Sequence, residues 1–282
     1  MPLPKNFDLE DFVQDVLAED LGKGGDVTSN ATIPEDARFT AEMNCRQAIV
    51  VAGLELAAAF FRALDGSVEI EPLATDGDRA EHGTTLMRLA GDARAMLAAE
   101  RSALNTLQHL SGIATLTRQY ADAIQGTGVV LLDTRKTIPG LRLLEKYAAR
   151  MGGAQNHRLR LDDGVLIKDN HVAVCGGVSE AVRRAKAAAT GLQVQVEVDR
   201  IEQIEPALDA GADRLLLDNM DPAKLREAVK LVGGRVPLEA SGGVTVETIR
   251  FLAETGVNYI SVGRITQSAP AVDIGLDYAM SR

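Results

Sequence analysis

Polar strand ends recur at a nearly constant interval along the second half of the chain. Short apolar runs end at Glu197, Asp218, Glu239 and Gly263, so 21, 21 and 24 residues separate successive ends. Each interval fits one buried strand, one helix and two short loops. Repeats of this unit build a parallel sheet whose polar ends share one edge, and in β/α barrels the active site is assembled at that edge.

The repeat extends back to two earlier apolar runs. The predicted strands are residues 129–132, 165–167, 192–198, 214–217, 236–239 and 259–262. A doubly wound open sheet is the competing architecture, but its nucleotide-binding form has a Gly-x-Gly-x-x-Gly turn after the first strand, and this turn is missing. The repeat therefore favours an α/β barrel.

The first third of the chain has a different pattern, in which helices mix with short alternating strands. The spacing of apolar residues predicts helices over residues 8–21, 54–64 and 93–124, the last in two pieces around Ser111-Gly112. Residues 25–29 have the composition of a turn. Strands are predicted within residues 37–52, 68–73 and 84–89. This order indicates a separate α+β layer.

Composition excludes several classes of protein. The 282 residues are 46% hydrophobic, which is enough for a packed core, and the net charge of −10 argues against non-specific nucleic-acid binding. No apolar run approaches the length of a membrane span, and the N-terminus has no apolar signal core. Cys45 and Cys175 lie far apart without metal-binding spacing. Two buried thiols and a cytoplasmic location are therefore expected.

Positive charge is concentrated around the first two strands of the repeat. Residues 135–171 hold eight Lys and Arg against four Asp and Glu, whereas the whole chain holds 30 against 40. A local excess of cations in an acidic protein indicates a built anion site. Arg142, Lys146 and Arg150 are better explained as the solvated face of a helix over residues 141–151. The favoured members of the site are the strand-end cations Arg135, Lys136, His157, Arg158 and Lys168.

Two other groups of residues reach the same edge. Carboxylates beside a phosphate site usually hold ribose hydroxyls or Mg²⁺, so Glu197 and Asp218 are predicted to do so, with a general base or a plain salt bridge as alternatives. Ser241-Gly242-Gly243, with Gly263 at the next strand end, suits a phosphate cradle of backbone N–H groups. No His/Cys cluster indicates zinc. The residues alone predict a barrel enzyme that joins a polyanionic small molecule to a phosphorylated sugar, with Mg²⁺.

Longer segments match a known family. They are Glu19-Asp20 with residues 25–28, ERSALNTLQHLSGIAT (100–115), DTRKTIPGLR (133–142), KYAARMGGAQNHRLRLDDGVLIKDNH (146–171), VEVD (196–199), LLLDN (215–219), EASGGV (239–244) and GVNYISVGRIT (256–266). In this order, and over essentially the whole chain, the sequence resembles the quinolinate phosphoribosyltransferases, also called carboxylating nicotinate-nucleotide pyrophosphorylases.

The resemblance implies a fold class and a reaction. The fold is α/β, with an N-terminal α/β sandwich domain over residues 1–112 and an open, incomplete, six- or seven-stranded α/β barrel over residues 113–270. Residues 271–282 are expected to pack back on the N-terminal domain. The implied enzyme is a pentosyltransferase that converts quinolinate and phosphoribosyl pyrophosphate to nicotinate mononucleotide, CO2 and pyrophosphate in de novo NAD biosynthesis.

The resemblance also implies the roles of individual residues. The expected catalytic residues are Lys136, Lys168, Glu197 and Asp218, of which Glu197 and Asp218 would hold the ribose and Mg²⁺. Lys136 and Lys168 would lie toward the pyrophosphate. The other expected substrate contacts are Arg135, His157, Arg158 and Lys168 at the quinolinate carboxylates, Ser241, Gly242, Gly243 and Gly263 at the 5′-phosphate, and Thr134.

Arg101 has two interpretations. By its residues alone, the helix that carries it has an ordinary polar surface. The resemblance instead implies that Arg101 reaches the quinolinate of a partner subunit, in a homodimer whose active sites are shared between subunits. Assembly of such dimers into a hexamer is a further alternative.

One position departs from the family, which commonly has Thr-His-Ser where this chain has Thr266-Gln267-Ser268. Gln can donate a hydrogen bond but carries no charge.

The alternatives are a molybdenum-transport-associated relative with another acceptor, a nicotinate-using phosphoribosyltransferase, and a non-catalytic scaffold. The number of cations argues against the first two. The presence of both carboxylates together with Lys168 argues against the scaffold.

Overall fold

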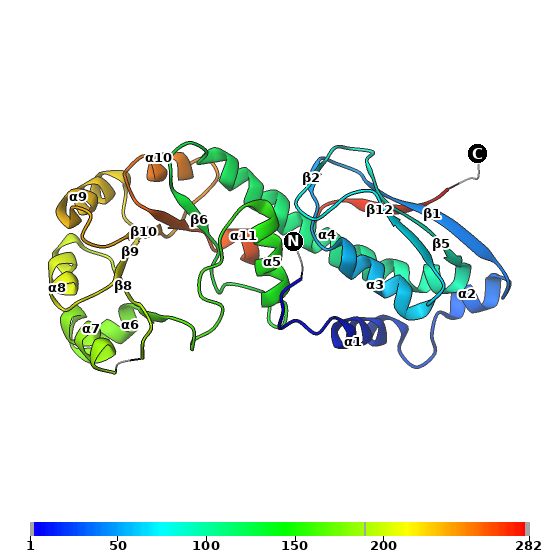
Figure 1. The fold of residues 1–282 in the computed structure, drawn as a ribbon, viewed down its shortest axis with the longest axis horizontal. Coiled ribbons are helices and arrows are strands. Elements are labelled where there is room, and N and C mark those ends of the chain that lie inside the picture. The colour runs from blue at the N-terminus through cyan, green and yellow to red at the C-terminus, as the bar shows by residue number, and fades with distance from the viewer. Residues whose placement is uncertain (1–2, 189, 280–282) are drawn as a thin grey trace. The chain divides into compact units, whose positions relative to one another are not determined.

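The computed structural model describes residues 3–188 and 190–279, and its contacts divide the chain into two units (Figure 1). One unit contains the chain up to Leu116, the segment Leu143–Gly152 and the chain from Ser268 onward. The other contains Thr117–Arg142 and Gly153–Gln267. Helix α4 (Ala93–Ala123) continues without a break through residue 112. The domain boundary expected between residues 112 and 113 therefore stays a prediction.

The first unit is built around a four-stranded antiparallel sheet. Its strand order is β12-β1-β5-β3, so the last strand of the chain pairs with the first. The strands are β1 (Arg38–Cys45), β3 (Glu69–Pro72), β5 (Thr85–Asp92) and β12 (Ile274–Tyr278), with the short pair β2 (Ile49–Val50) and β4 (Arg79–Ala80) beside them. The helices are α1 (Leu9–Leu21), α2 (Val27–Thr32), α3 (Leu54–Leu64) and α4.

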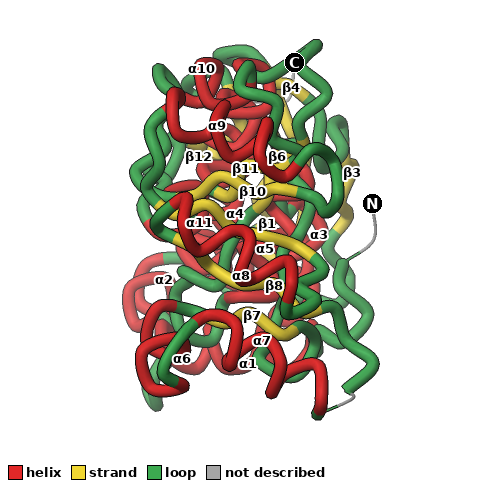
Figure 2. The backbone as a smooth tube through the Cα atoms, turned by 90° about the vertical axis from the view of Figure 1, so that its left-hand side faces the viewer, coloured by secondary structure: helices red, strands yellow, loops and turns green. Residues whose placement is uncertain are grey.

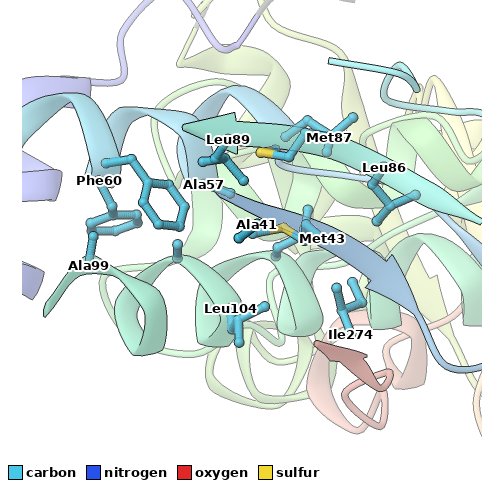
Figure 3. Packing of buried hydrophobic residues seen from close by; sticks show 14 of the residues in the cluster. Ala41, Met43, Ala57, Phe60, Leu86, Met87, Leu89, Ala99, Leu104 and Ile274 are labelled. Carbon is cyan, nitrogen blue, oxygen red and sulfur yellow. The ribbon is translucent and has the colours of Figure 1, made fainter. Parts of the chain in front are cut away.

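The core of this unit follows from the alternation of its strands. Met43 of β1 and Leu89 of β5 are buried on one face of the sheet, because successive side chains of a strand point to opposite faces. Helix α3 contributes Phe60 and helix α4 contributes Leu104 to the same cluster (Figure 3). Each fully buried side chain of this size contributes about 1.5–3 kcal/mol to folding.

Two local predictions in this unit are wrong. Helix α4 is one piece, because Gly112 serves a close approach: a Cβ there would lie 2.1 Å from the carbonyl oxygen of Pro270. The predicted turn at residues 25–29 is the start of α2. The Asp26 side chain accepts hydrogen bonds from the N–H groups of Thr28 and Ser29, which caps that helix.

The second unit is an open parallel sheet of six strands. The order is β6-β11-β10-β9-β8-β7, so the two strands that come first in the sequence lie at opposite edges. A single bridge, Leu132 to Gln155, adds to the outer edge of β6. The expected open, incomplete barrel is confirmed. Its strands are β6 (Val130–Leu132), β7 (Val165–Ile167), β8 (Val194–Val198), β9 (Arg214–Asp218), β10 (Leu238–Ser241) and β11 (Tyr259–Ser261).

Helices alternate with these strands along the chain, and α7, α8 and α9 lie outside the sheet (Figures 1 and 2). This arrangement leaves the carboxyl ends of the strands together at one edge. The helices of this half of the chain are α5 (Arg142–Gly152), α6 (Asp169–Cys175), α7 (Val178–Ala187), η1 (Ile201–Gln203), α8 (Ile204–Asp209), α9 (Pro222–Val232), α10 (Ile249–Ala253) and α11 (Arg264–Gln267).

Helix α5 is more buried than a solvated face allows. Lys146 is 1% exposed and Glu145 is fully buried, with its Oε1 3.0 Å from His109 Nε2. The Tyr147 hydroxyl donates to Asp76 Oδ2 at 2.6 Å. The solvated-face interpretation is therefore wrong for Lys146, because Leu143–Gly152 of α5 belongs to the first unit and packs within it.

Two further expectations concern the cysteines and the membrane. Cys45 is buried, as expected, but Cys175 is partly exposed at the end of α6, because α6 buries none of its residues. No helix within residues 3–188 and 190–279 is long and apolar enough to cross a membrane.

Candidate active site

A cavity of about 670 Å³ lies at the carboxyl ends of the barrel strands. It gathers nearly every residue that the sequence predicted for the site. Arg101 is the exception, since it is exposed on α4 and does not line this cavity. The predicted residues that line it are Thr134, Arg135, Lys136, His157, Arg158, Lys168, Glu197, Asp218, Ser241, Gly242, Gly243 and Gly263.

Two arginines form a strongly positive wall of the cavity. Burial, and then the charge of Arg135, lowers the pKa of the Arg158 guanidinium. Arg158 Nη1 donates to the carbonyl oxygen of Gly164 at 2.8 Å, while the buried Nε of Arg135 has no hydrogen-bond partner in the described structure. Two partly desolvated cations that repel each other are stabilised by an anion, so this wall is suited to a carboxylate ligand.

The loop that carries Arg158 is fixed by a buried carboxylate at the end of β6. Asp133 is fully buried, and its Oδ1 accepts a hydrogen bond from the backbone N–H of His157 at 2.8 Å. Its Oδ2 accepts one from Asn156. The ring Nδ1 of His157 in turn accepts a hydrogen bond from the Arg158 N–H. Asp133 therefore positions two residues of the cavity wall without being a lining residue itself.

The loop after β6 is held on both sides of Lys136. The backbone N–H of Lys136 donates to Thr134 Oγ1 at 3.0 Å, and the backbone carbonyl oxygen of Lys136 accepts from the Thr266 hydroxyl at 2.7 Å. A Cβ on Gly263 would lie 2.8 Å from Lys136 Cδ. Glycine at this strand end thus makes room for the lysine stem beside the cavity.

The two carboxylates Glu197 and Asp218 line the same cavity, and the pKa of each is raised. Burial, and then the charge of Asp218, raises the pKa of Glu197, while Lys168 opposes that rise. Burial likewise raises the pKa of Asp218, against a hydrogen bond from Asn219 and the charges of Lys136 and Lys168. Perturbed carboxylates in a cleft are typical of functional sites.

The glycine loop after β10 depends on backbone geometry. Gly242 has a φ of +96°, and a Cβ there would lie 2.2 Å from Asn219 Oδ1. Asn219 itself has a φ of 54°, which asparagine tolerates better than most residues. The Asn219 N–H donates to the carbonyl oxygen of Ser241 at 2.9 Å, and its side chain donates to Asp218 Oδ2 at 2.6 Å. The loop is therefore tied to the carboxylate of the neighbouring strand.

Other lining residues were missed as site residues by the sequence analysis. Glu239 was recognised as a strand end but was given no role, although its side chain is fully buried under the cavity. Ser261, Arg264 and Gln267 also line the cavity. The predicted position of Glu239 near the end of a barrel strand was the signal that could have indicated its place, although β10 continues two residues beyond it to Ser241. Across the described parts of the chain there is no group of three or more His, Cys, Asp and Glu residues arranged to hold a metal ion.

Comparison with known proteins shows the family to which the chain belongs. The model of the quinolinate phosphoribosyl transferase N-terminal domain matches residues 26–111, and that of the C-terminal domain matches residues 113–277. The chain belongs to the quinolinate phosphoribosyltransferase family. A family member named nicotinate-nucleotide pyrophosphorylase (carboxylating), from Mycobacterium leprae, is 43% identical over 95% of this chain and 96% of its own length.

Two other members of the family extend the comparison. Quinolinate phosphoribosyltransferase (decarboxylating) 2, mitochondrial, from Nicotiana glauca is 41% identical over 98% of this chain and 83% of its own length. The crystal structure of nicotinate-nucleotide pyrophosphorylase from Ehrlichia chaffeensis has a TM-score of 0.93 and 39% identity, and the match covers 97% of this chain and 100% of that one. The sandwich and the open barrel are thus the fold of the family.

Proposed function

We propose that this quinolinate phosphoribosyltransferase converts quinolinate and phosphoribosyl pyrophosphate to nicotinate mononucleotide, CO2 and pyrophosphate in de novo NAD biosynthesis. One observation carries the proposal: in a chain of this family, a single cavity joins Arg135, Arg158 and Lys168 to the carboxylates of Glu197 and Asp218. Cations suited to a dicarboxylate lie in the same cavity as groups suited to a ribose. Its volume is in the range of small-molecule sites.

We assign the cations to two anions. A guanidinium binds a carboxylate through two parallel hydrogen bonds, which favours Arg135 and Arg158 as ligands of quinolinate, with Lys168 and His157 beside them. The charges of Lys136 and Lys168 both act on the Asp218 carboxyl. This supports a role for the two lysines where pyrophosphate meets the ribose.

The backbone after β10 and β11 is suited to the 5′-phosphate. Gly242 and Gly243 have positive φ values and expose their N–H groups beside Ser241 in the cavity. Glycines allow a phosphate to approach the backbone closely. We assign this loop, with Gly263 and Thr134, to the phosphoribosyl group.

The donor set fits Mg²⁺. Glu197 and Asp218 are oxygen ligands whose pKa values are raised by burial, and for Glu197 also by the charge of Asp218, so a divalent cation would favour the ionised forms of both. We propose that these two residues would hold Mg²⁺ together with oxygens of the substrate. When bound, Mg²⁺ neutralises charge on the leaving pyrophosphate.

The residues of the chain contribute position and charge to the reaction. The ring nitrogen of quinolinate bonds to C1 of the ribose as the bond from C1 to pyrophosphate breaks, and the electron pair leaves with pyrophosphate. Because C1 becomes positive in this transition state, Lys136 and Lys168 lower the barrier by stabilising the anion that departs. The alkylated ring then loses its 2-carboxylate as CO2, and the ring carbon keeps the electron pair and takes up a proton. The site also lowers the barrier by holding the two substrates in contact and in the right orientation.

The assay that tests the function uses purified protein with quinolinate, phosphoribosyl pyrophosphate and Mg²⁺. We expect nicotinate mononucleotide and CO2 in equal amounts, with nicotinate inert as a substitute. Turnover of nicotinate would favour the nicotinate-using alternative. Binding of phosphoribosyl pyrophosphate without turnover would favour a relative with another acceptor.

We also propose that the enzyme is a homodimer in which Arg101 of one chain completes the site of the other. An exposed arginine with Asn105 exposed one turn later on α4 supports such a surface. Arg101→Ala and Lys168→Ala proteins should each be inactive. Their mixture should regain part of the activity, because mixed dimers then contain one intact site. No recovery in mixed dimers verified by mass spectrometry would exclude the shared site.

We place the enzyme in the cytoplasm. The acidic, moderately hydrophobic composition supports this location. Two Nicotiana relatives, by contrast, are named as mitochondrial proteins. Detection of the protein in the cytosolic fraction of its own cells, with organelle markers absent, is the expected result.

A further inference from the structure

The interior of the barrel directly beneath the cavity is charged. Glu239 is fully buried, Gln195 Nε2 donates to its Oε2 at 2.8 Å, and Arg214 Nη2 lies 2.8 Å from the same oxygen. The Arg214 guanidinium lies 3.8 Å from the ring centroid of Tyr259. Barrel interiors are usually filled by branched apolar side chains. An ion pair in this layer therefore calls for an explanation other than packing.

Stability does not supply that explanation. Within the described chain, Glu239 Oε1 and Arg214 Nε are buried and make no hydrogen bond, while Arg214 Nη2 is paired with Glu239 Oε2. A buried charged atom without a hydrogen-bond partner destabilises a fold, and apolar residues of similar size often replace buried ion pairs at no loss. The arrangement is thus expected to serve the site above it.

His157 connects this layer to the cavity wall. Its Nδ1 accepts a hydrogen bond from the Arg158 N–H at 2.8 Å, and its Nε2 lies 3.5 Å from Glu239 Oε2. A ring nitrogen that accepts a hydrogen bond carries no proton, so the proton of the ring is on Nε2 and faces Glu239. Both nitrogens of the imidazole are thereby engaged by the protein.

We infer that Glu239 is a positioning residue for quinolinate binding, which holds the imidazole of His157 as its Nε2–H form and thereby fixes Arg158 at the cavity wall. Arg214 and Gln195 hold the Glu239 carboxylate in place from below. His157 acts mainly as a link between Glu239 and Arg158. The inference deepens the proposed function and rests on it.

The first test needs no variant of Glu239. Nitrogen-15 NMR of the histidine-labelled wild-type protein at neutral pH distinguishes the two ring forms, and the signal that disappears in His157→Asn identifies this ring. We expect an unprotonated Nδ1 and a protonated Nε2. The opposite form, or a doubly protonated ring, would overturn the inference because Nδ1 could not then accept from Arg158.

The second test is a double-mutant cycle read by calorimetric titration. Glu239→Gln keeps the size of the side chain, and we expect it to weaken quinolinate binding roughly tenfold while changing the affinity for phosphoribosyl pyrophosphate less than about twofold. His157→Asn should have a similar effect. The double variant should bind quinolinate no more weakly than His157→Asn alone, because the first residue acts through the second.

Gln195→Leu is the matched control, since it removes a neutral partner of the same carboxylate oxygen and leaves the charge. We expect it to weaken quinolinate binding less than about threefold. Additive losses in the cycle, or equal losses for both substrates, would refute the positioning role. Absence of quinolinate binding by the wild-type protein would instead refute the proposed function, and the nitrogen spectrum would still decide the state of His157.

Discussion

Replacement of Gly242 by alanine should damage the phosphoribosyl side of the site through a route that the structure defines. The left-handed conformation at φ +96° costs an L-residue about 1–2 kcal/mol. The new Cβ would also lie 2.2 Å from Asn219 Oδ1, so the Asn219 side chain must move by roughly 1 Å to restore an ordinary contact. That movement breaks its 2.6 Å hydrogen bond to Asp218 Oδ2. A hydrogen bond to a charged group contributes about 1.5–3 kcal/mol.

Gly243→Ala is the matched control within the same loop. Gly243 has a φ of +60°, and a Cβ there would meet nothing within 4 Å. The left-handed conformation should cost each variant about 1–2 kcal/mol of unfolding free energy in urea titrations, and Gly242→Ala should lose about 1.5–3 kcal/mol more with the Asn219 hydrogen bond. Because both glycines line the proposed phosphate cradle, each variant should weaken phosphoribosyl pyrophosphate binding, but Gly242→Ala should weaken it about tenfold more than Gly243→Ala does in calorimetry. Equal affinities in the two variants would refute the argument that Asn219 transmits the change to Asp218.

The remaining predictions concern charge and stability. Arg158→Gln and Arg135→Gln should each weaken quinolinate binding by about 10- to 150-fold, and phosphoribosyl pyrophosphate binding much less, in the same titrations. The raised pKa of Glu197 means that, without Mg²⁺, its contribution to stability is present at low pH and is lost as pH rises through that pKa. Glu197→Gln should therefore raise the melting temperature at neutral pH but not in acid, and Mg²⁺ should stabilise the wild-type protein progressively less as pH falls. Tyr147→Phe removes the hydrogen bond to Asp76 and should lower the unfolding free energy by about 1.5 kcal/mol without changing either substrate affinity.

The barrel could be predicted from the sequence because its signal is local and repeated. Each strand is a short apolar run with a polar residue at or just after its end, and the strand over residues 165–167 has the predicted bounds. The N-terminal helices at residues 9–21 and 54–64 were equally clear from their apolar spacing. The break predicted in the long helix was wrong because a glycine favours a break only when nothing packs on it. At Gly112 the partner is Pro270, which lies far along the chain.

Burial of charged side chains was the main feature that sequence spacing did not reveal. Lys146 has the neighbours of a solvated lysine in the sequence, yet the fold covers it almost completely. Glu239 was predicted to end a strand like Glu197 and Asp218, but β10 runs from Leu238 to Ser241, so Glu239 lies inside the strand and its buried carboxylate is paired with Arg214. Its neighbours come from other strands of the sheet, and only the tertiary arrangement brings them together.

Both proposed ligands would relieve the perturbed pKa values of the residues in this site. Neighbouring positive charge and burial disfavour the ionised form of Arg158, while burial disfavours the ionised forms of Glu197 and Asp218. The arginines and the carboxylates line the same cavity. A dicarboxylate at the arginines and a cation with a phosphorylated sugar at the carboxylates relieve both at once. This relief would favour binding of the two substrates side by side, which is the condition that bond formation between them requires.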